Sequence, residues 1–232
     1  MPRFSISLAA AAAALVAAAA LAQNPPAPAQ PKEPAKAEDP SKAAPPMNIA
    51  FPGDAYILDI DIVTGEKLGE KTVPSVYMGR RLQFANEANA KKFAANPSEY
   101  MPKLDEAMIK AQTPYYPLKE CVVSGHGADG EWLDVISQNR LYRLCCTDCE
   151  PMLRESPGEY LAKLDAAVIA AQKPNYPLDT CPISGKKLGS MGEPKNVVVG
   201  NRLVRLCCSG CMKKFMEDPR PAIAKIDAAT KK

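Results

Sequence analysis

Apolar and polar residues follow the same pattern three times along the chain, at a period of about 60 residues. Each copy opens on a tyrosine and a partly apolar stretch that leads into a Thr-Gly or Ser-Gly turn, starting at Tyr56, Tyr116 and Tyr176. Each copy closes on Lys-Leu-Asp or Lys-Ile-Asp, ending at Asp105, Asp165 and Asp227. Solenoid repeats are typically about 20–50 residues long. The longer period predicts three tandem small domains: repeat 1 (residues 54–112), repeat 2 (residues 114–172) and repeat 3 (residues 174–232).

A β-hairpin is expected in the middle of each copy. In repeat 3 the apolar run of residues 197–206 is interrupted by Gly200-Asn201, a pair typical of a hairpin turn. Residues 135–144 are the counterpart in repeat 2. A hairpin combined with helices makes the expected fold class α+β.

A short helix should follow each hairpin. In repeat 3 it is expected to open at Cys211, with Phe215 facing the core at helical spacing. The same inward position is held in the other two copies by Phe93 and Leu153. Core packing explains all three residues.

A second helix is marked by its start signal. Ser156-Pro157 offers an N-cap and a proline at the first helical position, and Glu159 lies three residues after the cap. The same signal recurs, fully or in part, at Asn96-Pro97 and Asp218-Pro219. The apolar residues that follow in repeat 2 recur as an amphipathic helix requires: Leu161, Leu164 and Val168. The turn around the Thr-Gly or Ser-Gly pair near the start of each repeat is called the knuckle. Each repeat is thus expected to hold a knuckle, a hairpin and one or two helices.

Composition narrows the functional classes. The chain of 232 residues has a net charge of +3, which gives no electrostatic case for nucleic acid or for an anionic membrane surface. It has a single histidine and shows no paired carboxylates, phosphate-binding glycine loop or Ser/His/Asp set. We therefore expect a protein that is not an enzyme. The sequence indicates no particular partner protein.

The N-terminal residues have the pattern of an export signal. Arg3 precedes an alanine-rich apolar run at residues 8–21. The small-x-small motif Ala20-Leu21-Ala22 places the signal-peptide cleavage site before Gln23. The run is shorter than the roughly 20 residues of a spanning helix, so residues 1–22 are expected to be a signal peptide and the mature chain to have no membrane span. Proline-rich residues 23–53 are expected to be a disordered linker, acting as a tether or as a spacer with no role of its own. The mature protein would then be periplasmic or extracellular.

All eight cysteines lie in repeats 2 and 3, four in each. One precedes the Ser-Gly turn, and three follow the hairpin where the short helix begins. A folded hairpin brings these two places together, and helix N-terminal amides favour thiolate over thiol. Four thiolates suit zinc, and two or three suit copper(I). The candidate metal ligands are Cys121, Cys145, Cys146 and Cys149 in repeat 2, and Cys181, Cys207, Cys208 and Cys211 in repeat 3.

The spacing does not decide which member of each adjacent cysteine pair binds, and two other uses of the cysteines stay open. An even number of cysteines in an exported chain is typical of a disulfide framework, which would make the protein a disulfide-stapled interaction module. Cys146-Thr-Asp-Cys149 and Cys208-Ser-Gly-Cys211 are also Cys-x-x-Cys segments at a helix start, as in thiol–disulfide redox proteins. The βαβ pattern of a thioredoxin-like fold is absent, and the adjacent cysteines favour metal binding.

Repeat 1 has no cysteine. The four matching positions are held by Asp61, Ala85, Asn86 and Asn89, which we expect to be solvated surface residues. If this repeat folds, the scaffold does not strictly need metal. His126, after the Ser-Gly turn of repeat 2, is expected to be a surface turn residue, because Lys186 holds its place in repeat 3.

The cysteine-bearing repeats resemble the YHS/TRASH group of small metal-binding modules. In repeat 3 the resemblance is carried by the hairpin that ends at Cys207, then by Cys211, Phe215 and Asp218-Pro219. Repeat 2 matches it with Leu153 and Ser156-Pro157 in the last two places. The resemblance covers nearly all of residues 114–232, and residues 54–112 as scaffold alone.

The resemblance implies treble-clef-like domains that bind zinc, copper or another heavy metal, in sensing or trafficking. The chain departs from the family at the first ligand. YHS modules usually show Asp-Pro-Val-Cys-Gly, whereas Cys181-Pro-Ile-Ser-Gly185 has its cysteine where the aspartate would be. The first ligand has therefore moved by three residues, and the family's ligand geometry does not transfer directly.

Overall fold

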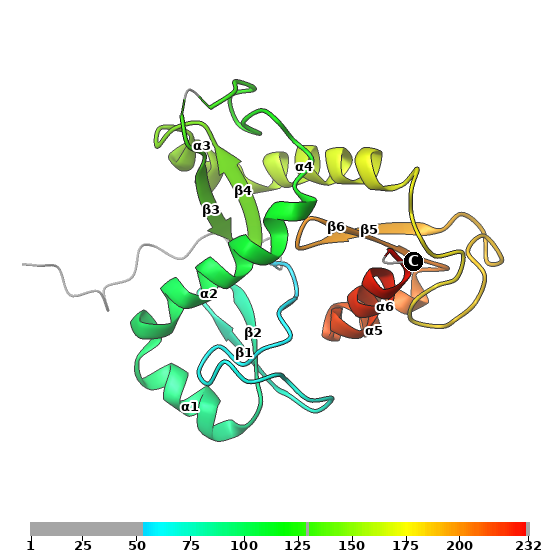
Figure 1. Ribbon diagram of the computed structural model, residues 1–232, viewed down its shortest axis with the longest axis horizontal. Helices are drawn as coiled ribbons and strands as arrows, with labels where there is room; N and C mark the ends of the chain where they lie inside the picture. The colour runs from blue at the N-terminus through cyan, green and yellow to red at the C-terminus, as the bar shows by residue number, and fades with distance from the viewer. Residues whose placement is uncertain (1–52, 129, 231–232) are drawn as a thin grey trace, which may run out of the picture. The chain divides into compact units, whose positions relative to one another are not determined.

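The computed structural model describes residues 53–128 and 130–230. The expected signal peptide and nearly all of the expected linker lie outside these residues. Within them the fold is α+β, and each repeat contains a two-stranded antiparallel hairpin followed by two helices (Figure 1). Among the described residues no helix has both the length and the apolar character that crossing a membrane requires.

The elements follow the same order in each repeat. Repeat 1 contains β1 (Val73–Tyr77), β2 (Arg80–Phe84), α1 (Glu87–Ala95) and α2 (Pro97–Gln112), and a short 3-10 helix follows at Thr113–Tyr115. Repeat 2 contains β3 (Leu133–Ser137), β4 (Arg140–Leu144), α3 (Cys149–Glu155) and α4 (Pro157–Gln172). Repeat 3 contains β5 (Lys195–Val199), β6 (Arg202–Leu206), α5 (Gly210–Glu217) and α6 (Arg220–Thr230).

Each hairpin closes on a two-residue turn with positive φ at both residues. In repeat 3, Gly200 and Asn201 have φ of 53° and 59° and join Val199 to its partner Arg202. This conformation matches the twist of the turn to that of the strands, and the predicted Gly200-Asn201 turn is confirmed. Ile57 also packs closely against Gly200, because a Cβ atom there would lie 2.5 Å from Cδ1 of Ile57 and would displace that side chain.

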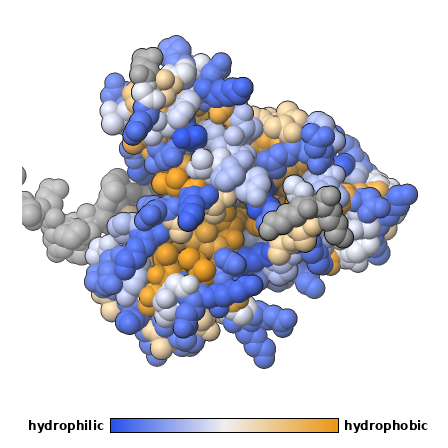
Figure 2. All heavy atoms as spheres, viewed as in Figure 1, coloured by the Kyte–Doolittle hydropathy of each residue, from blue (hydrophilic) through white to orange (hydrophobic). Residues whose placement is uncertain are grey.

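Three hydrophobic clusters lie between the hairpins and the helices, and two of them cross repeat boundaries: Val198 and Leu203 of repeat 3 belong to the cluster of repeat 2, and Ala55 of repeat 1 belongs to that of repeat 3. The predicted inward positions of the short helices are confirmed, since all three are buried: Phe93, Leu153 and Phe215. On the face shown in Figure 2, hydrophobic side chains gather in the middle of the view, with hydrophilic ones around them. The large apolar side chains that are most exposed are Val76, Met78, Met152 and Met191.

The long helices α2 and α4 begin at the predicted prolines, but their expected side-chain caps are not formed. Asn96 and Ser156 make no capping hydrogen bond, because each residue also ends the preceding short helix and its backbone N–H points back to that helix. In repeat 3, Asp218 Oδ1 does accept a hydrogen bond from the Arg220 backbone N–H at 3.1 Å. Of the predicted apolar positions in α4, Leu164 and Val168 are buried, whereas Leu161 is half-buried.

The aspartate near the end of each repeat pairs with an equivalent arginine of the same repeat. The first residue of the second strand in each hairpin is an arginine, and it forms an ion pair with the aspartate 25 residues later: Arg80 with Asp105, Arg140 with Asp165, and Arg202 with Asp227. This pair ties the hairpin to the long helix. It explains the aspartate at the end of every copy.

The long helix of one repeat is joined to the hairpin of the next by a glutamine. Gln112 Nε2 donates to the Asn139 carbonyl at 2.9 Å, and its Oε1 accepts from the Leu141 N–H at 2.9 Å. Gln172 makes the same two bonds, at 2.9 and 2.8 Å, to Asn201 and Leu203. The glutamine side chain at the end of one repeat therefore links it to the backbone of the next repeat, from repeat 1 to repeat 2 and from repeat 2 to repeat 3.

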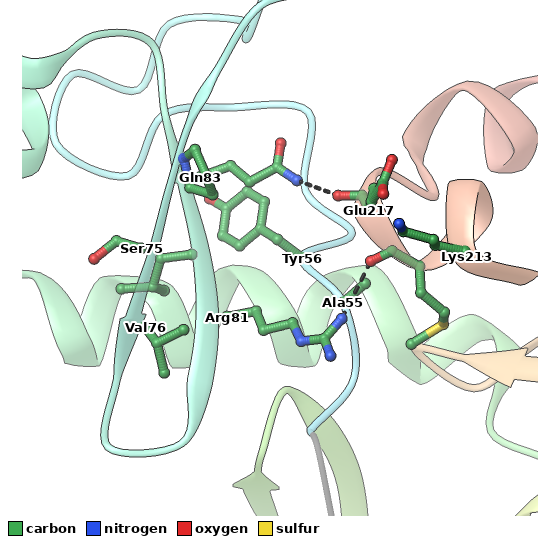
Figure 3. A pocket seen from close by; sticks show the side chains of 11 residues that line it. Ala55, Tyr56, Ser75, Val76, Arg81, Gln83, Lys213 and Glu217 are labelled. Carbon is green, nitrogen blue, oxygen red and sulfur yellow. Dashed lines mark hydrogen bonds between the residues drawn. The ribbon is translucent and has the colours of Figure 1, made fainter.

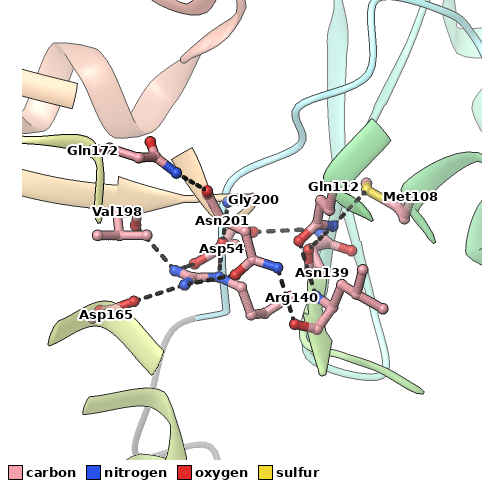
Figure 4. A network of polar contacts seen from close by, with 11 residues as sticks. Asp54, Met108, Gln112, Asn139, Arg140, Asp165, Gln172, Val198, Gly200 and Asn201 are labelled. Atoms are coloured by element: carbon pink, nitrogen blue, oxygen red, sulfur yellow. Dashed lines mark hydrogen bonds and ion pairs between the residues drawn. The ribbon is translucent and has the colours of Figure 1, made fainter. Parts of the chain in front are cut away.

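Arg140 is the centre of a network that involves all three repeats (Figure 4). Its guanidinium donates to the Asp54 carboxylate, 2.7 Å from Nε and 3.0 Å from Nη2, and to the Val198 carbonyl at 3.1 Å. Asp54 also accepts from the Gly200 N–H at 2.6 Å. One carboxylate at the start of repeat 1 thus binds the hairpins of repeats 2 and 3.

Repeat 1 also contacts α5. Arg81 Nη1 donates to the Met216 carbonyl at 3.2 Å, and Gln83 Nε2 donates to the Glu217 carbonyl at 3.1 Å, beside a cavity of about 740 Å³ (Figure 3). These bonds hold the C-terminal end of α5. The first turn of the same helix carries Cys211.

Candidate metal centres

Three thiols converge in repeat 3, from three separate places in the sequence. Cys181 lies at the start of the Ser-Gly knuckle, Cys207 directly follows β6, and Cys211 lies in the first turn of α5. All three are buried, and their Sγ atoms all lie within 4.8 Å of one another. The hairpin accounts for this convergence, because it returns the chain from the knuckle to the start of the short helix.

Repeat 2 forms the same group from Cys121, Cys145 and Cys149, whose Sγ atoms also lie within 4.8 Å of one another. Cys121 and Cys149 are buried, and Cys145 is half-buried. Two metal-sized thiol triads are therefore present in the described residues, one in each cysteine-bearing repeat. We name them triad 2 and triad 3 after their repeats.

The knuckle that supplies the first thiol is held by its own backbone. In repeat 3 the Cys181 N–H donates to the Lys186 carbonyl, and the Gly185 N–H donates to the Cys181 carbonyl, both at 2.8 Å. Gly185 has a φ of 72°, which explains the glycine in the Ser-Gly pair. The Cys121 knuckle of repeat 2 is closed by the equivalent two bonds, at 2.7 and 2.8 Å.

The serine of each Ser-Gly pair also belongs to the site. Ser184 Oγ lies 3.2 Å from Cys207 Sγ, and Ser124 Oγ lies 3.3 Å from Cys145 Sγ. The sequence interpretation treated these serines as turn residues alone and missed this contact. A signal was present, since the two cysteine-bearing repeats have Ser-Gly and repeat 1 has Thr64-Gly65.

The sulfur–sulfur distances fit a shared metal ion. Sγ of Cys149 lies 3.7 Å from Sγ of Cys145, and Sγ of Cys211 lies 3.8 Å from Sγ of both Cys181 and Cys207. A tetrahedral zinc ion with bonds of about 2.3 Å to sulfur places its ligands about 3.8 Å apart. A disulfide needs about 2.05 Å, and all eight cysteines are free thiols in this structure.

The fourth cysteine of each repeat lies beside the triad rather than in it. Cys146 is exposed, and its Sγ lies 3.8 Å from Sγ of Cys145 and 3.7 Å from Sγ of Cys149. Cys208 is half-buried, and its Sγ lies 3.8 Å from Sγ of Cys207. The structure thus brings six of the eight candidate ligands into the triads and places the other two next to them.

The knuckle thiols are poised for ionisation. Burial raises the pKa of Cys181, but hydrogen bonds from the Ser184 hydroxyl and the Cys207 amide outweigh burial and lower the pKa to about 6. Burial also raises the pKa of Cys121, and hydrogen bonds from the Ser124 and Cys145 amides outweigh it, which leaves a pKa of about 7. Each triad therefore holds one thiol that ionises more readily than a free cysteine.

The helix thiols behave in the opposite way. Burial, followed by hydrogen bonds with the neighbouring thiols, raises the pKa of both Cys149 and Cys211 above that of a free cysteine. When the knuckle thiol of a triad is ionised, a second thiolate on the helix is unfavourable in the same buried space without a cation. A bound metal ion would remove this penalty by neutralising both thiolates.

The prediction that Asp61 of repeat 1 is a solvated surface residue is wrong, because Asp61 is fully buried. Its Oδ2 accepts hydrogen bonds from the Ala85 N–H at 2.7 Å and from Asn89 Nδ2 at 2.9 Å, and its Oδ1 accepts from the Val63 N–H at 2.8 Å. Ala85 and Asn89 are half-buried, and Asn86 alone of the four is exposed. A carboxylate thus joins the knuckle to the start of the short helix, where triads 2 and 3 have sulfur.

His126 is exposed in the turn, as predicted, and is outside triad 2. Its backbone carbonyl, rather than its side chain, takes part in the site, by accepting the hydrogen bond of the Cys121 N–H.

Comparisons with protein-family models, with curated proteins and with solved structures found no match to this chain.

Proposed function

We propose that this protein binds two thiophilic metal ions, one at triad 2 and one at triad 3. The observation that supports the proposal most directly is the convergence of three thiols at each site, within 4.8 Å of one another. Thiolate ligands select zinc or copper(I) over calcium and magnesium. Zinc suits the site if the adjacent fourth cysteine also binds, and copper(I) suits the triad alone.

In this proposal the protein is exported to a periplasmic or extracellular space and acts without catalysis. The signal-like pattern of residues 1–22 supports export. The knuckle, hairpin and helix in each repeat, together with the motifs around Cys207 and Cys211, support treble-clef-like modules of the YHS/TRASH type. The metal ion is then a cargo or a sensed ligand.

The proposal is tested by elemental analysis of the full chain with a parallel count of free thiols. We expect about two equivalents of zinc or copper per chain, one for each triad. Cys149→Ala and Cys211→Ala should each remove one equivalent. Glu155→Ala, an exposed position on α3, is the matched control and should keep both ions. Absence of metal together with absence of free thiols would instead indicate a disulfide framework.

Metal binding should also release protons. The raised pKa of Cys211 keeps this thiol protonated near neutral pH, whereas Cys181, with its pKa lowered to about 6, is already ionised there. Each ion must displace at least one proton, so affinity for metal falls as the pH falls. Calorimetric titrations in two buffers of different ionisation enthalpy measure the released protons. Equal heats in the two buffers would contradict this expectation.

A further inference from the structure

We propose that Cys146 and Cys208 are exchange ligands, through which a metal ion enters and leaves the buried triads. The inference rests on the proposed function and assigns separate roles to the four thiols of each site. The triads retain the ion. The fourth thiol contacts the ion together with an incoming or outgoing thiolate from a carrier, which is either a small dithiol or a cysteine-bearing protein.

The first support is a difference in exposure that occurs in both repeats. The knuckle and helix thiols, Cys121, Cys149, Cys181 and Cys211, are buried, and the remaining triad thiols are half-buried in repeat 2 (Cys145) and buried in repeat 3 (Cys207). In repeat 2 the fourth thiol, Cys146, is exposed, and Cys208 is half-buried in repeat 3. The two residues that follow each fourth thiol in the chain are also exposed: Thr147 and Asp148 in repeat 2, and Ser209 and Gly210 in repeat 3. A carrier can therefore approach each site at the fourth thiol.

The second support is distance. Cys146 Sγ lies 3.7 Å from Cys149 Sγ and 3.8 Å from Cys145 Sγ, which are the separations expected for sulfurs that share one ion. Cys208 Sγ lies 3.8 Å from Cys207 Sγ. In repeat 2 the fourth thiol can thus share an ion with Cys145 and Cys149 without any rearrangement of the short helix. An ion can pass from it to the triad by exchange of one ligand at a time.

The third support comes from repeat 1, which has a hairpin and two helices without any cysteine, because Asp61 joins its knuckle to its helix. The scaffold does not depend on metal at this position. Structural zinc sites are closed and have all four ligands in place. A site whose fourth thiol is more exposed than its triad, as in both repeats, suits a transferable ion better than a permanent staple.

The exchange step is a substitution at the metal ion, without a change in oxidation state. The bond from the ion to Cys146 Sγ forms while one bond from the ion to a carrier sulfur breaks. The Cys146 proton goes to water, and the carrier thiolate that leaves takes up a proton. The triad thiols then replace the remaining carrier sulfurs in the same way, and release follows the reverse order.

The test uses the full chain loaded with Zn²⁺ and, under anaerobic conditions, with Cu⁺. The Cys146→Ser/Cys208→Ser variant should still bind about two ions, one at each triad. Its rate of metal transfer to dithiothreitol in excess should fall by at least about tenfold, because the thiolate pathway is removed. Cys121→Ser/Cys181→Ser is the comparison and should lose metal retention, since it removes a buried ligand from each triad.

The outcomes separate the two proposals. If the wild-type chain binds neither ion, the proposed function fails. If the wild type binds two ions and Cys146→Ser/Cys208→Ser transfers them at the wild-type rate, the exchange role is overturned and the proposed function stands. The exchange role is also overturned if this variant no longer retains metal, since Cys146 and Cys208 would then be retention ligands. Circular dichroism of each variant confirms that the hairpins and helices are kept.

Discussion

Asp61 holds in repeat 1 the place that Cys121 and Cys181 hold in the other two repeats, and the backbone around it is the same. Its N–H donates to the Glu66 carbonyl at 2.8 Å, and its carbonyl accepts from the Gly65 N–H at 2.7 Å, as in both cysteine knuckles. Its carboxylate then accepts three hydrogen bonds. Hydrogen bonds to an ionised group are stronger than neutral ones, so a single side chain can join the segments that converge on sulfur in repeats 2 and 3.

Removal of this carboxylate should destabilise repeat 1. Asp61→Ala leaves the Ala85 and Val63 N–H groups and the Asn89 amide without their acceptor, and we expect the free energy of unfolding to fall by about 3 kcal/mol. Asp59→Ala is the control, because Asp59 is exposed and lies in the same stretch. Urea denaturation in the presence of a chelator measures both variants. Equal stability of the two would show that Asp61 does not hold the knuckle.

The burial of Asp61 was not predictable from the sequence, for a physical reason. An aspartate is ordinarily exposed, and it becomes favourable in a core only when donors surround it. Val63 is a local donor, but the other two donors, Ala85 and Asn89, are more than 20 residues away. Their approach depends on the folded hairpin, which a local pattern of residues does not reveal.

At the scale of elements, the sequence predicted the parts that depend on local chemistry. The Gly200-Asn201 turn follows from the need for positive φ, and the starts of α2 and α4 follow from proline at the first helical position. The missing side-chain caps at Asn96 and Ser156 arise where two helices meet at one residue. The choice within each adjacent cysteine pair was open because the chain changes direction between β4 and α3. The structure places Cys145 in the triad and Cys146 at the surface.

Because the three repeats share these elements, the metal site should be transferable to repeat 1. Asp61→Cys, Ala85→Cys and Asn89→Cys together reproduce the three positions of triads 2 and 3, and we expect a third equivalent of zinc. The first change places a thiol on the knuckle, and the other two place thiols after β2 and in the first turn of α1. Elemental analysis after removal of excess zinc measures the gain.

A matched variant moves the first thiol by two residues. Asp59→Cys with Ala85→Cys and Asn89→Cys should bind two ions as in the wild type, because the side chain of Asp59 is exposed. If the variant with Asp61→Cys, Ala85→Cys and Asn89→Cys unfolds without metal, recovery of its circular dichroism signal on addition of zinc also shows that the third site binds zinc. A stoichiometry of two with an intact fold would show that the shared backbone is insufficient to make a site.

At the scale of the whole described molecule, the repeats depend on one another through residues outside the metal sites. Gln112 and Gln172 extend the hydrogen bonding of one repeat into the next, and Asp54 binds Arg140 and Gly200 at once. Ile57 packs against Gly200, where a Cβ atom would displace the Ile57 side chain. The tandem pattern in the sequence predicted three separate units. It did not predict this network, because the partners lie up to 146 residues apart.

Loss of the Asp54 carboxylate should therefore uncouple the repeats. Asp54→Ala removes two bonds from the Arg140 guanidinium, which is 2% exposed, and one from the Gly200 N–H. Arg140 keeps its ion pair with Asp165, so we expect a cost of about 2–3 kcal/mol, below that of leaving a buried charge without any partner. Hydrogen exchange should show lost protection of the Gly200 amide.

Asp59→Ala is the control for this change. Asp59 is exposed and lies in repeat 1, so we expect a cost below about 1 kcal/mol and unchanged exchange in repeat 3. Repeat 1 also holds the end of α5 through Arg81 and Gln83, and the first turn of α5 carries Cys211. If Asp54→Ala weakens this docking, metal bound at triad 3 should be lost before metal at triad 2 during thermal unfolding. Unchanged protection of Gly200 in Asp54→Ala would show that this carboxylate does not couple the repeats.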